Sequence, residues 1–307
     1  MKYDELSYIA DDGKSIHVHR WTPERAPKAL LLVAHGMAEH GARYARLAEN
    51  LIAAGYELWA PDHRGHGRTA AEGELGWLAE QDGFRRVVDD LGGLAQRMRA
   101  DRPGAKLFLL GHSWGSLLSQ GFISVYGDRI DGCVLSASTG IPPKMSGIGA
   151  LVAAIGGRVQ GWKAPAKLAD KLSFGEFNKP FEPGRTAFDW LSRDEASVDA
   201  YINDPLCGFV CTWEYFRDII KGLKWIYTPS TQEAIPKKLP VFLFTGTADP
   251  IGGSTGGLAA LADRYRDLGL KDVRLKLYEG ARHETLNETN REEVMAELRA
   301  WLDGLCQ

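Results

Sequence analysis

One serine of this chain lies in a setting that suits nucleophilic chemistry. The apolar run Leu107–Leu110 leads directly into Gly-His-Ser-Trp-Gly at residues 111–115, and a helical pattern follows. This is the pattern G-x-S-x-G in a strand–turn–helix context, which holds a serine hydroxyl exposed above the end of a strand. The two glycines avoid collisions between Cβ atoms and neighbouring backbone, and the helix N-terminus favours a developing oxyanion. The pattern therefore predicts Ser113 as a nucleophile.

A serine hydroxyl needs an adjacent base, and one histidine of the chain is placed to provide it. For a serine in such a turn, the partners follow in the chain order acid, then histidine. Of the eight histidines, only His283 comes after Ser113, and it follows the strand predicted at Val273–Tyr278. We therefore predict His283 as the general base.

Asp249 is the aspartate that the sequence favours as the partner of this base. It lies three residues beyond the strand predicted at Val241–Gly246, so its carboxylate belongs to the same rim of the sheet as the serine. There it would accept the ring N–H of His283 and stabilise the imidazolium. The alternative is that Asp249 only begins a turn before Pro250. Three later aspartates fall in or after a helical pattern and are weaker candidates: Asp263, Asp267 and Asp272.

The oxyanion that forms during attack needs two backbone N–H donors. Trp114, the residue after the serine, supplies the first. The second is expected from Met37, because the apolar run Leu30–Ala34 leads into His-Gly-Met-Ala-Glu-His at residues 35–40. Within this loop, His35 is predicted to order the chain rather than to act as a base.

Candidate substrate-binding residues come from the same loop and from an aromatic-rich stretch further on. Glu39 and His40 either meet the polar end of a substrate or form surface hydrogen bonds. The later aromatic residues could line an acyl pocket, although most such residues form core. The candidates for substrate binding are Gly36, Glu39, Trp213 and Phe216.

The elements that must position these residues alternate between strands and helices, which predicts an α/β fold built on a mostly parallel sheet. Two of the apolar runs lack polar alternation, as expected for strands buried on both faces. The predicted strands are Ser15–Trp21, Ala29–Ala34, Tyr56–Ala60, Lys106–Leu110, Gly132–Ser138, Pro240–Gly246 and Val273–Tyr278. The predicted helices are Tyr44–Ala53, Gly83–Ala100, Trp114–Tyr126, Gly256–Leu268 and Arg291–Leu305.

About 100 residues separate two of these strands, and a structureless loop of that length is improbable. We predict an inserted helical cap over residues 141–235, with residues 1–140 and 236–307 forming the catalytic core. The alternative is a separately folding second domain. Within the cap, Met145–Gly157 carries no charge, and it is either an apolar lid that touches lipid aggregates or a buried cap helix.

Composition excludes several classes of protein. With 37 Lys+Arg against 40 Asp+Glu, the formal net charge is −3, which provides no basic field for nucleic acid. Four cysteines are too few for a disulfide scaffold, no run of about 18 apolar residues predicts a membrane span, and no apolar signal core stands at the N-terminus. We expect a cytoplasmic protein without a transmembrane segment. The pair His63 and His66 lacks the third protein ligand that zinc needs, so no metal site is predicted.

The motifs together resemble those of the α/β-hydrolase superfamily, and more narrowly of its monoacylglycerol lipase and lysophospholipase-like (serine aminopeptidase-like) group. They are residues 35–40, Pro-Asp-His-Arg-Gly-His-Gly at residues 61–67, the serine motif, and Asp249 with His283. The match covers about residues 10–140 and 238–305. The resemblance implies an eight-stranded, mostly parallel sheet, a cap over the site and no cofactor. It also implies Ser113, Asp249 and His283 as a triad, and it leaves one departure: Ala38 stands where many of the lipases carry glycine.

We therefore expect a serine hydrolase that cleaves carboxylic esters through an acyl-enzyme, acting on a small acyl ester or lipid. The alternatives on the same triad are a serine aminopeptidase, a cofactor-free haloperoxidase or a carbon–carbon hydrolase. A non-catalytic small-ligand receptor on this fold is a further alternative. Dehalogenases and epoxide hydrolases are disfavoured, because they place aspartate where Ser113 stands.

Overall fold

The computed structural model describes residues 1–140, 146–251 and 256–307. Its centre is an eight-stranded sheet in the order β1-β2-β4-β3-β5-β6-β7-β8. The pairs β1–β2 and β2–β4 are antiparallel, and all the following pairs are parallel. The strands are β1 (Lys2–Ile9), β2 (Ser15–Thr22), β3 (Ala29–Ala34), β4 (Tyr56–Pro61), β5 (Lys106–His112), β6 (Gly132–Ser136), β7 (Val241–Gly246) and β8 (Val273–Tyr278). The predicted α/β architecture with an eight-stranded, mostly parallel sheet is confirmed.

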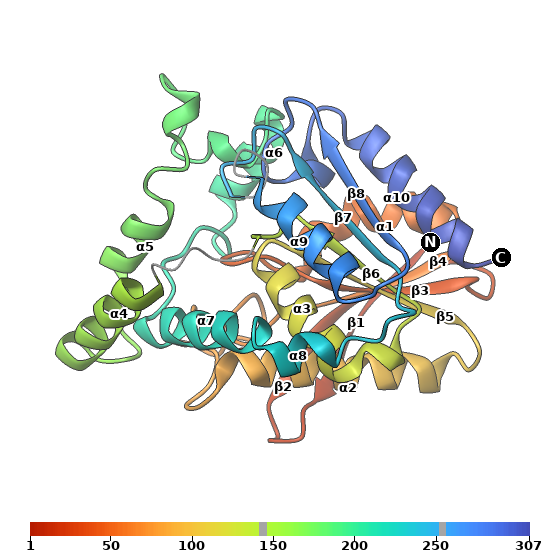
Figure 1. Cartoon of the computed structure of the whole chain (residues 1–307), viewed down its shortest axis with the longest axis horizontal. Coiled ribbons are helices and arrows are strands. Elements are labelled where there is room, and N and C mark those ends of the chain that lie inside the picture. The colour runs from red at the N-terminus through yellow and green to blue at the C-terminus, as the bar shows by residue number, and fades with distance from the viewer. Residues whose placement is uncertain (141–145, 252–255) are drawn as a thin grey trace.

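Helices cover both faces of this sheet, which explains the apolar runs (Figure 1). Every residue of β3 is buried: Leu30 and Leu32 pack on one side, and Leu31 and Val33 pack on the other. One face is covered by α1 (Ala45–Ala53) and α10 (Arg291–Leu305), and the other by α2 (Gly83–Asp101), α3 (Trp114–Tyr126) and α9 (Gly257–Asp267). These helices agree with the predicted ones to within one residue at each end.

Three strands differ from the prediction by more than one residue, and one of them, β5, continues from the predicted end at Leu110 to His112. β1 was not predicted, because its sequence KYDELSYI carries charged residues and only every second side chain is partly covered. Such alternation is typical of an edge strand with one solvent-exposed face. The strand predicted to reach Ser138 ends at Ser136, where Ala137 has φ 49° and turns the chain out of the sheet.

Between β6 and β7, the described residues form five α-helices and two short 3-10 helices, and we call this interval the cap. The α-helices are α4 (Ser146–Gln160), α5 (Lys167–Phe174), α6 (Glu195–Asn203), α7 (Trp213–Ile226) and α8 (Pro229–Glu233). Side chains of α7 belong to the same apolar core as α2 and α3, as do Ala153 of α4 and Ala169 of α5, while α4 and α5 extend to one side of the molecule (left in Figure 1). The inserted cap over residues 141–235 stays a prediction. The boundary predicted after residue 140 adjoins residues 141–145, and these lie outside the described residues, as does Met145 of the predicted lid.

Over the described ranges, none of the helices combines the length and the apolar character that crossing a bilayer requires.

Candidate active site

Ser113 lies in a sharp turn between β5 and α3. Its backbone has φ 52° and ψ −118°, a conformation that costs a non-glycine residue about 1–3 kcal/mol. Its N–H donates to the carbonyl of Ser136 on β6 at 2.9 Å, which holds the turn against the sheet. The flanking glycines are required, since a Cβ at Gly115 would lie 2.0 Å from the carbonyl oxygen of Ala34, and one at Gly111 would lie 2.4 Å from that of Gly115.

Asp249 and His283 meet at the same edge of the sheet. Nδ1 of His283 lies 3.0 Å from Oδ1 of Asp249, and both side chains are buried. The other oxygen, Oδ2, accepts from the hydroxyl of Thr245 at 2.6 Å, and Oδ1 also accepts from the N–H of Ile251 at 2.9 Å. The carboxylate is therefore oriented toward the imidazole by a strand residue and by its own turn.

The charges of this pair stabilise each other. Burial opposes the ionised form of Asp249, but the adjacent imidazole and the hydrogen bonds outweigh burial, so the pKa of Asp249 is lowered. Burial likewise opposes a charged His283, yet the carboxylate raises the pKa of His283 above its ordinary 6.5. An imidazole of this kind accepts a proton readily and keeps it stabilised. The three weaker candidates, Asp263, Asp267 and Asp272, are all exposed.

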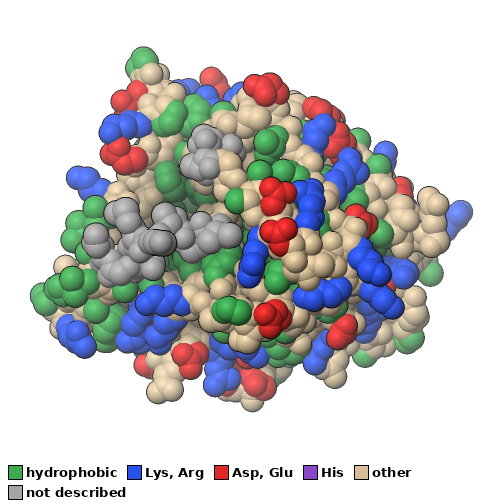
Figure 2. All heavy atoms as spheres, viewed as in Figure 1, with side chains coloured by type: hydrophobic (Ala, Val, Ile, Leu, Met, Phe, Trp, Pro, Cys, Tyr) green, Lys and Arg blue, Asp and Glu red, His purple; other side chains and the backbone are tan. Residues whose placement is uncertain are grey.

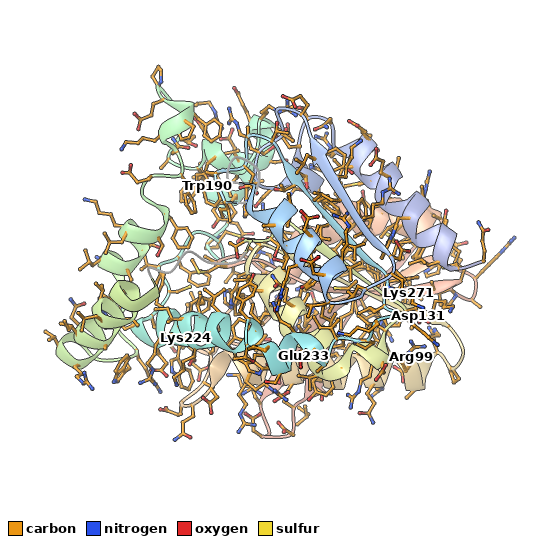
Figure 3. The ribbon with its side chains drawn as sticks, viewed as in Figure 1. Arg99, Asp131, Trp190, Lys224, Glu233 and Lys271 are labelled. Carbon is orange, nitrogen blue, oxygen red and sulfur yellow. The ribbon has the colours of Figure 1, made fainter. Side chains whose placement is uncertain are left out.

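The cap holds the loop that carries His283. The N–H of His283 donates to the carbonyl of Trp190 at 3.3 Å, and the next residue, Glu284, donates to that of Leu191 at 2.7 Å. The indole of Trp190, which is labelled in Figure 3, lies 5.0 Å from the imidazole between ring centroids. Sequence reasoning missed this contribution, because no motif marks Trp190.

The loop after β3 carries Met37 beside the serine, and both residues line the same two cavities. The next residue, Ala38, has φ 51°, which is the left-handed region that favours glycine. This conformation explains why a glycine is common here, and alanine bears a strain of about 1–2 kcal/mol. The carbonyl of Ala38 accepts from the N–H of Gly208 at 2.9 Å and from the hydroxyl of Tyr201 at 3.1 Å, so the cap also fixes this loop.

His35 orders this region, as predicted. Its Nδ1 lies 2.8 Å from the carbonyl of Gly36, and its Nε2 accepts from the N–H of His63 at 2.9 Å. The rings of His35, His63 and His66 pack together behind Trp114. Burial lowers the pKa of His35 and His63 well below 6.5 and that of His66 to about 4, so all three are neutral.

These neutral histidines predict a loss of stability in acid. Burial also lowers the pKa of His112 to about 4. Because the unfolded chain binds protons from pH 6.5 downward and the folded chain does not, the free energy of unfolding falls by about 1 kcal/mol per histidine at pH 5.5. The pKa values of His283, Asp90, Asp170 and Asp218 are raised and act in the opposite sense, while the lowered pKa of His17 adds to the loss. We expect a lower Tm at pH 5.5 than at pH 7.5, and a smaller drop for His66→Phe. Equal Tm values would contradict this account.

Two cavities of different character meet at Ser113. The first cavity, of about 330 Å³, has both aromatic and charged side chains in its lining, and we call it the polar cavity because of the charged ones, which include Glu39, Asp170, Lys171 and Glu284, besides His283. The apolar cavity, of about 340 Å³, lies between α3, α4, α5 and α7 and is lined largely by aliphatic and aromatic side chains, including Leu117, Val152, Phe216, Ile219 and Leu223. The two cavities share Met37, Ser113, Phe174 and Ile251.

The four candidate substrate-binding residues have different positions. Gly36 lines the polar cavity and Phe216 lines the apolar one. Trp213 lies apart from the described lining of both cavities: its ring is buried beneath Gly156 of α4, and its Nε1 donates to Oε1 of Gln160 at 3.1 Å. Glu39 borders the polar cavity, but hydrogen bonds within the protein occupy both carboxylate oxygens.

Three groups of described side chains bring together ligand atoms of the kind that metals bind: Glu5, His17 and His19; His19, His40 and Asp62; and His40, Asp204 and Cys207. His63 and His66 belong to none of them. In the second group, whose three residues are all buried, Asp62 already accepts hydrogen bonds from the N–H groups of Gly41 and Arg68 and lies 3.2 Å from Nε2 of His19. These hydrogen bonds give Asp62 a structural role.

Comparison with known proteins gives a consistent result. The model of the family "Serine aminopeptidase, S33" matches residues 25–290. The chain is 30% identical to a monoacylglycerol lipase of Mycolicibacterium smegmatis, over 97% of this chain and 96% of the relative, and 31% identical to a monoglyceride lipase of Mus musculus, over 98% and 91%. A solved carboxyl esterase of Bacillus coagulans, in complex with glycerol, superposes with a TM-score of 0.89 at 26% identity, over 100% of both chains. The chain therefore belongs to the serine aminopeptidase S33 family, within the α/β-hydrolase fold that its motifs predict.

Proposed function

We propose that this protein is a serine hydrolase that cleaves carboxylic esters through an acyl-enzyme, with monoacylglycerols as its substrate class. The observation that carries the proposal is the 3.0 Å contact between Nδ1 of His283 and Oδ1 of Asp249. His283 lines the same cavity as Ser113. The names of the relatives described above are in keeping with it. The division into a catalytic core and a cap over residues 141–235 is part of the proposal.

In the proposed mechanism, His283 removes the proton of the Ser113 hydroxyl, and the alkoxide attacks the ester carbonyl. The backbone N–H groups of Met37 and Trp114 stabilise the oxyanion, a contribution of about 3–4 kcal/mol per donor. Asp249 keeps the imidazole in the tautomer whose free nitrogen faces the serine. The imidazolium then protonates the leaving alcohol, and a water activated by His283 releases the acid.

The two cavities suggest how a substrate would be divided. An acyl chain fits the apolar cavity, where burial of each methylene contributes about 0.8 kcal/mol. A hydrophilic alcohol such as glycerol fits the polar cavity, whose lining includes Asp170 and Lys171. A monoacylglycerol joins these two parts at the ester that Ser113 would attack.

A panel of substrates on the purified protein tests this assignment. Monoacylglycerols, lysophospholipids, simple nitrophenyl esters and aminoacyl amides would be compared by kcat/KM. We expect the monoacylglycerols to rank first and the amides last. A preference for aminoacyl amides would indicate that the carboxylates of the polar cavity bind the α-ammonium group of the substrate. The protein would then be a serine aminopeptidase rather than an esterase.

Narrowing the apolar cavity is expected to shorten the preferred acyl chain. Gly149 lines this cavity, and a Cβ there would lie 3.8 Å from Cδ1 of Ile220, so the first atom of a side chain has room. Gly149→Leu should lower kcat/KM for long-chain monoacylglycerols by about tenfold or more and leave short-chain esters unchanged. The control is Gly304→Leu, at an exposed helical position with no neighbour within 4 Å. An equal loss on all chain lengths would oppose this placement of the acyl chain.

The outer surface of the cap is suited to contact with lipid aggregates. The helix α4 buries Ala153, Gly156 and Gly157 but exposes Leu151, Ile155 and Val159 by 61%, 54% and 78%. Two leucines of α5, Leu168 and Leu172, are 55% and 65% exposed, and this apolar surface lies among basic side chains (Figure 2). The basic residues are Arg158, Lys163, Lys167 and Lys171. An apolar stripe bordered by positive charge is typical of reversible binding to a lipid interface.

Charged substitutions on this apolar stripe should weaken binding of the protein to lipid aggregates without changing ester hydrolysis itself. Ile155→Glu combined with Val159→Glu is expected to weaken sedimentation with anionic phospholipid vesicles by about tenfold or more, since each side chain contributes about 1.5–3 kcal/mol when buried. Hydrolysis of aggregated monoacylglycerol should fall, while that of a soluble short-chain ester should not. Ile9→Glu on β1, 61% exposed, is the control. Unchanged vesicle binding would oppose the proposal.

A further inference from the structure

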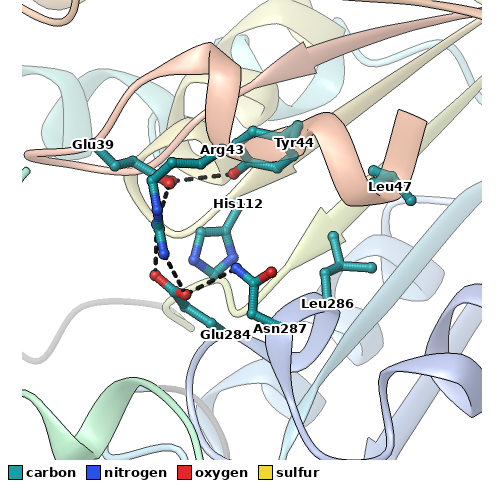
Figure 4. Close-up of a pocket in the computed structure, with 8 residues that line it drawn as sticks. All are labelled: Glu39, Arg43, Tyr44, Leu47, His112, Glu284, Leu286 and Asn287. Carbon is teal, nitrogen blue, oxygen red and sulfur yellow. Dashed lines mark hydrogen bonds and ion pairs between the residues drawn. The ribbon is translucent and has the colours of Figure 1, made fainter. Parts of the chain in front are cut away.

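A buried ionic bridge connects the loop after β3 with the loop that carries His283 (Figure 4). The guanidinium of Arg43 donates through Nη1 to Oε2 of Glu39 at 2.5 Å. It also donates through Nη1 and Nη2 to the two oxygens of Glu284, each at 2.8 Å. The side chains of Arg43, Glu39 and Glu284 are 12%, 4% and 6% exposed, so the bridge is screened from water.

Each carboxylate of the bridge is attached to one part of the proposed catalytic machinery. On one side, Oε1 of Glu39 accepts from the backbone N–H of Gly36 at 2.5 Å, directly before Met37. The hydroxyl of Tyr44 donates to the same oxygen at 3.1 Å. On the other side, Glu284 is the residue after His283, and its Oε2 also accepts from the side-chain amide of Asn287 at 2.9 Å.

The bridge also carries charge. Two carboxylates share one guanidinium. Burial opposes their ionisation, but Arg43, together with the neighbouring His112 and, for Glu39, the N–H of Gly36, outweighs it, so the pKa values of Glu39 and Glu284 are lowered. The group therefore has a net charge of about −1 beside His283. Among the described residues, Asp249 also faces His283 and raises its pKa, and the ring centroid of neutral His112 lies 4.9 Å from that of His283. Asp170 and Lys171 line the same cavity as His283.

We propose that Glu39, Arg43 and Glu284 act as positioning residues. They fix the N–H of Met37, which would donate to the oxyanion, relative to the imidazole of His283, and they add negative charge next to the imidazolium. The inference rests on the proposed function. Movement of either loop by about 1 Å would misalign the donor and the base, and such a displacement costs about 100-fold in rate. Both loops follow strands of the sheet, yet β3 and β8 are not adjacent, so the sheet does not pair them directly.

Two variants separate geometry from charge. Arg43→Lys keeps the positive charge but loses the fork that contacts both carboxylates. We expect its kcat to fall about 10- to 100-fold with KM within about twofold, and the acid limb of its kcat/KM profile to remain in place. Glu284→Gln keeps the shape but removes one negative charge. We expect a lower kcat and an acid limb shifted to lower pH, because the pKa of His283 falls.

Glu57→Gln is the matched control. Glu57 is equally buried and pairs with Arg102 at 2.9 Å, but it lies near the amino end of β4, at the opposite rim of the sheet. This variant should lose stability without a change in kcat or in the pH profile of the folded enzyme.

Other outcomes would overturn the proposal. If Arg43→Lys and Glu284→Gln behave like Glu57→Gln, the bridge is structural only. A raised KM with unchanged kcat would instead make Glu39 and Glu284 substrate ligands. Wild-type protein and Ser113→Ala, measured in parallel, distinguish these results from a failure of the proposed function, which would appear as equal ester hydrolysis by both.

Discussion

Replacing Ser113 with alanine is expected to lower kcat for ester hydrolysis by about four orders of magnitude or more. The hydroxyl is the atom that forms the acyl-enzyme, and loss of a serine nucleophile removes nearly all of the triad's contribution at once. Alanine fits the turn between β5 and α3, because the residue keeps its Cβ and its N–H to Ser136. Steady-state hydrolysis of a nitrophenyl ester, with Tm recorded for each protein, measures the effect.

Ser124→Ala provides the control for this substitution. Ser124 lies on the same helix α3, and its hydroxyl donates to the carbonyl of Gly121 at 2.7 Å, away from both cavities. Its activity should equal that of the wild type. A folded Ser113→Ala protein that retains ester hydrolysis would show that another group attacks the substrate.

Replacing Asp249 with asparagine should have the second-largest effect, a loss in kcat of about 10⁴-fold. Asparagine matches the carboxylate in shape, but its amide can donate to Nδ1 of His283 and thereby hold the imidazole in the wrong tautomer. The negative charge that raises the pKa of His283 is also lost, so any remaining activity should have its acid limb at lower pH.

Asp272→Asn is the control for this second prediction. Asp272 is exposed and precedes β8, so its loss should not change kcat. If Asp272→Asn were the inactive variant and Asp249→Asn the active one, the acid of the triad would be misassigned.

Much of the fold follows from local sequence patterns. Helices bury both faces of β3 and β5, so these strands consist mainly of consecutive apolar residues. Such runs can be recognised directly in the sequence. β1 is not recognisable in this way, since only its pairing with β2 distinguishes it from a polar loop. The path of the cap was not predictable, because its helices depend on long-range packing such as that of Trp213 beneath Gly156.

The candidate site shows the same limit. The positions of Ser113 and His283 follow from the motif and from the chain order, which depend on local turns. Trp213 and Phe216 are three residues apart on α7, and the sequence does not reveal which of them faces the cavity. The spacing of Glu39 and Arg43 by four residues was a signal for an ion pair, but the third member, Glu284, is 241 residues from Arg43 and becomes a neighbour only through the fold. The cytoplasmic location stays a prediction.

The central claim, that Ser113 is the nucleophile of an ester hydrolase, is tested most directly by labelling with a fluorophosphonate and mapping the adduct by mass spectrometry. We predict one adduct per chain, on the peptide that contains Ser113, with a parallel loss of ester hydrolysis and with little labelling of a folded His283→Ala variant. An adduct on a different residue, or full hydrolytic activity in protein whose Ser113 is quantitatively labelled, would contradict the account.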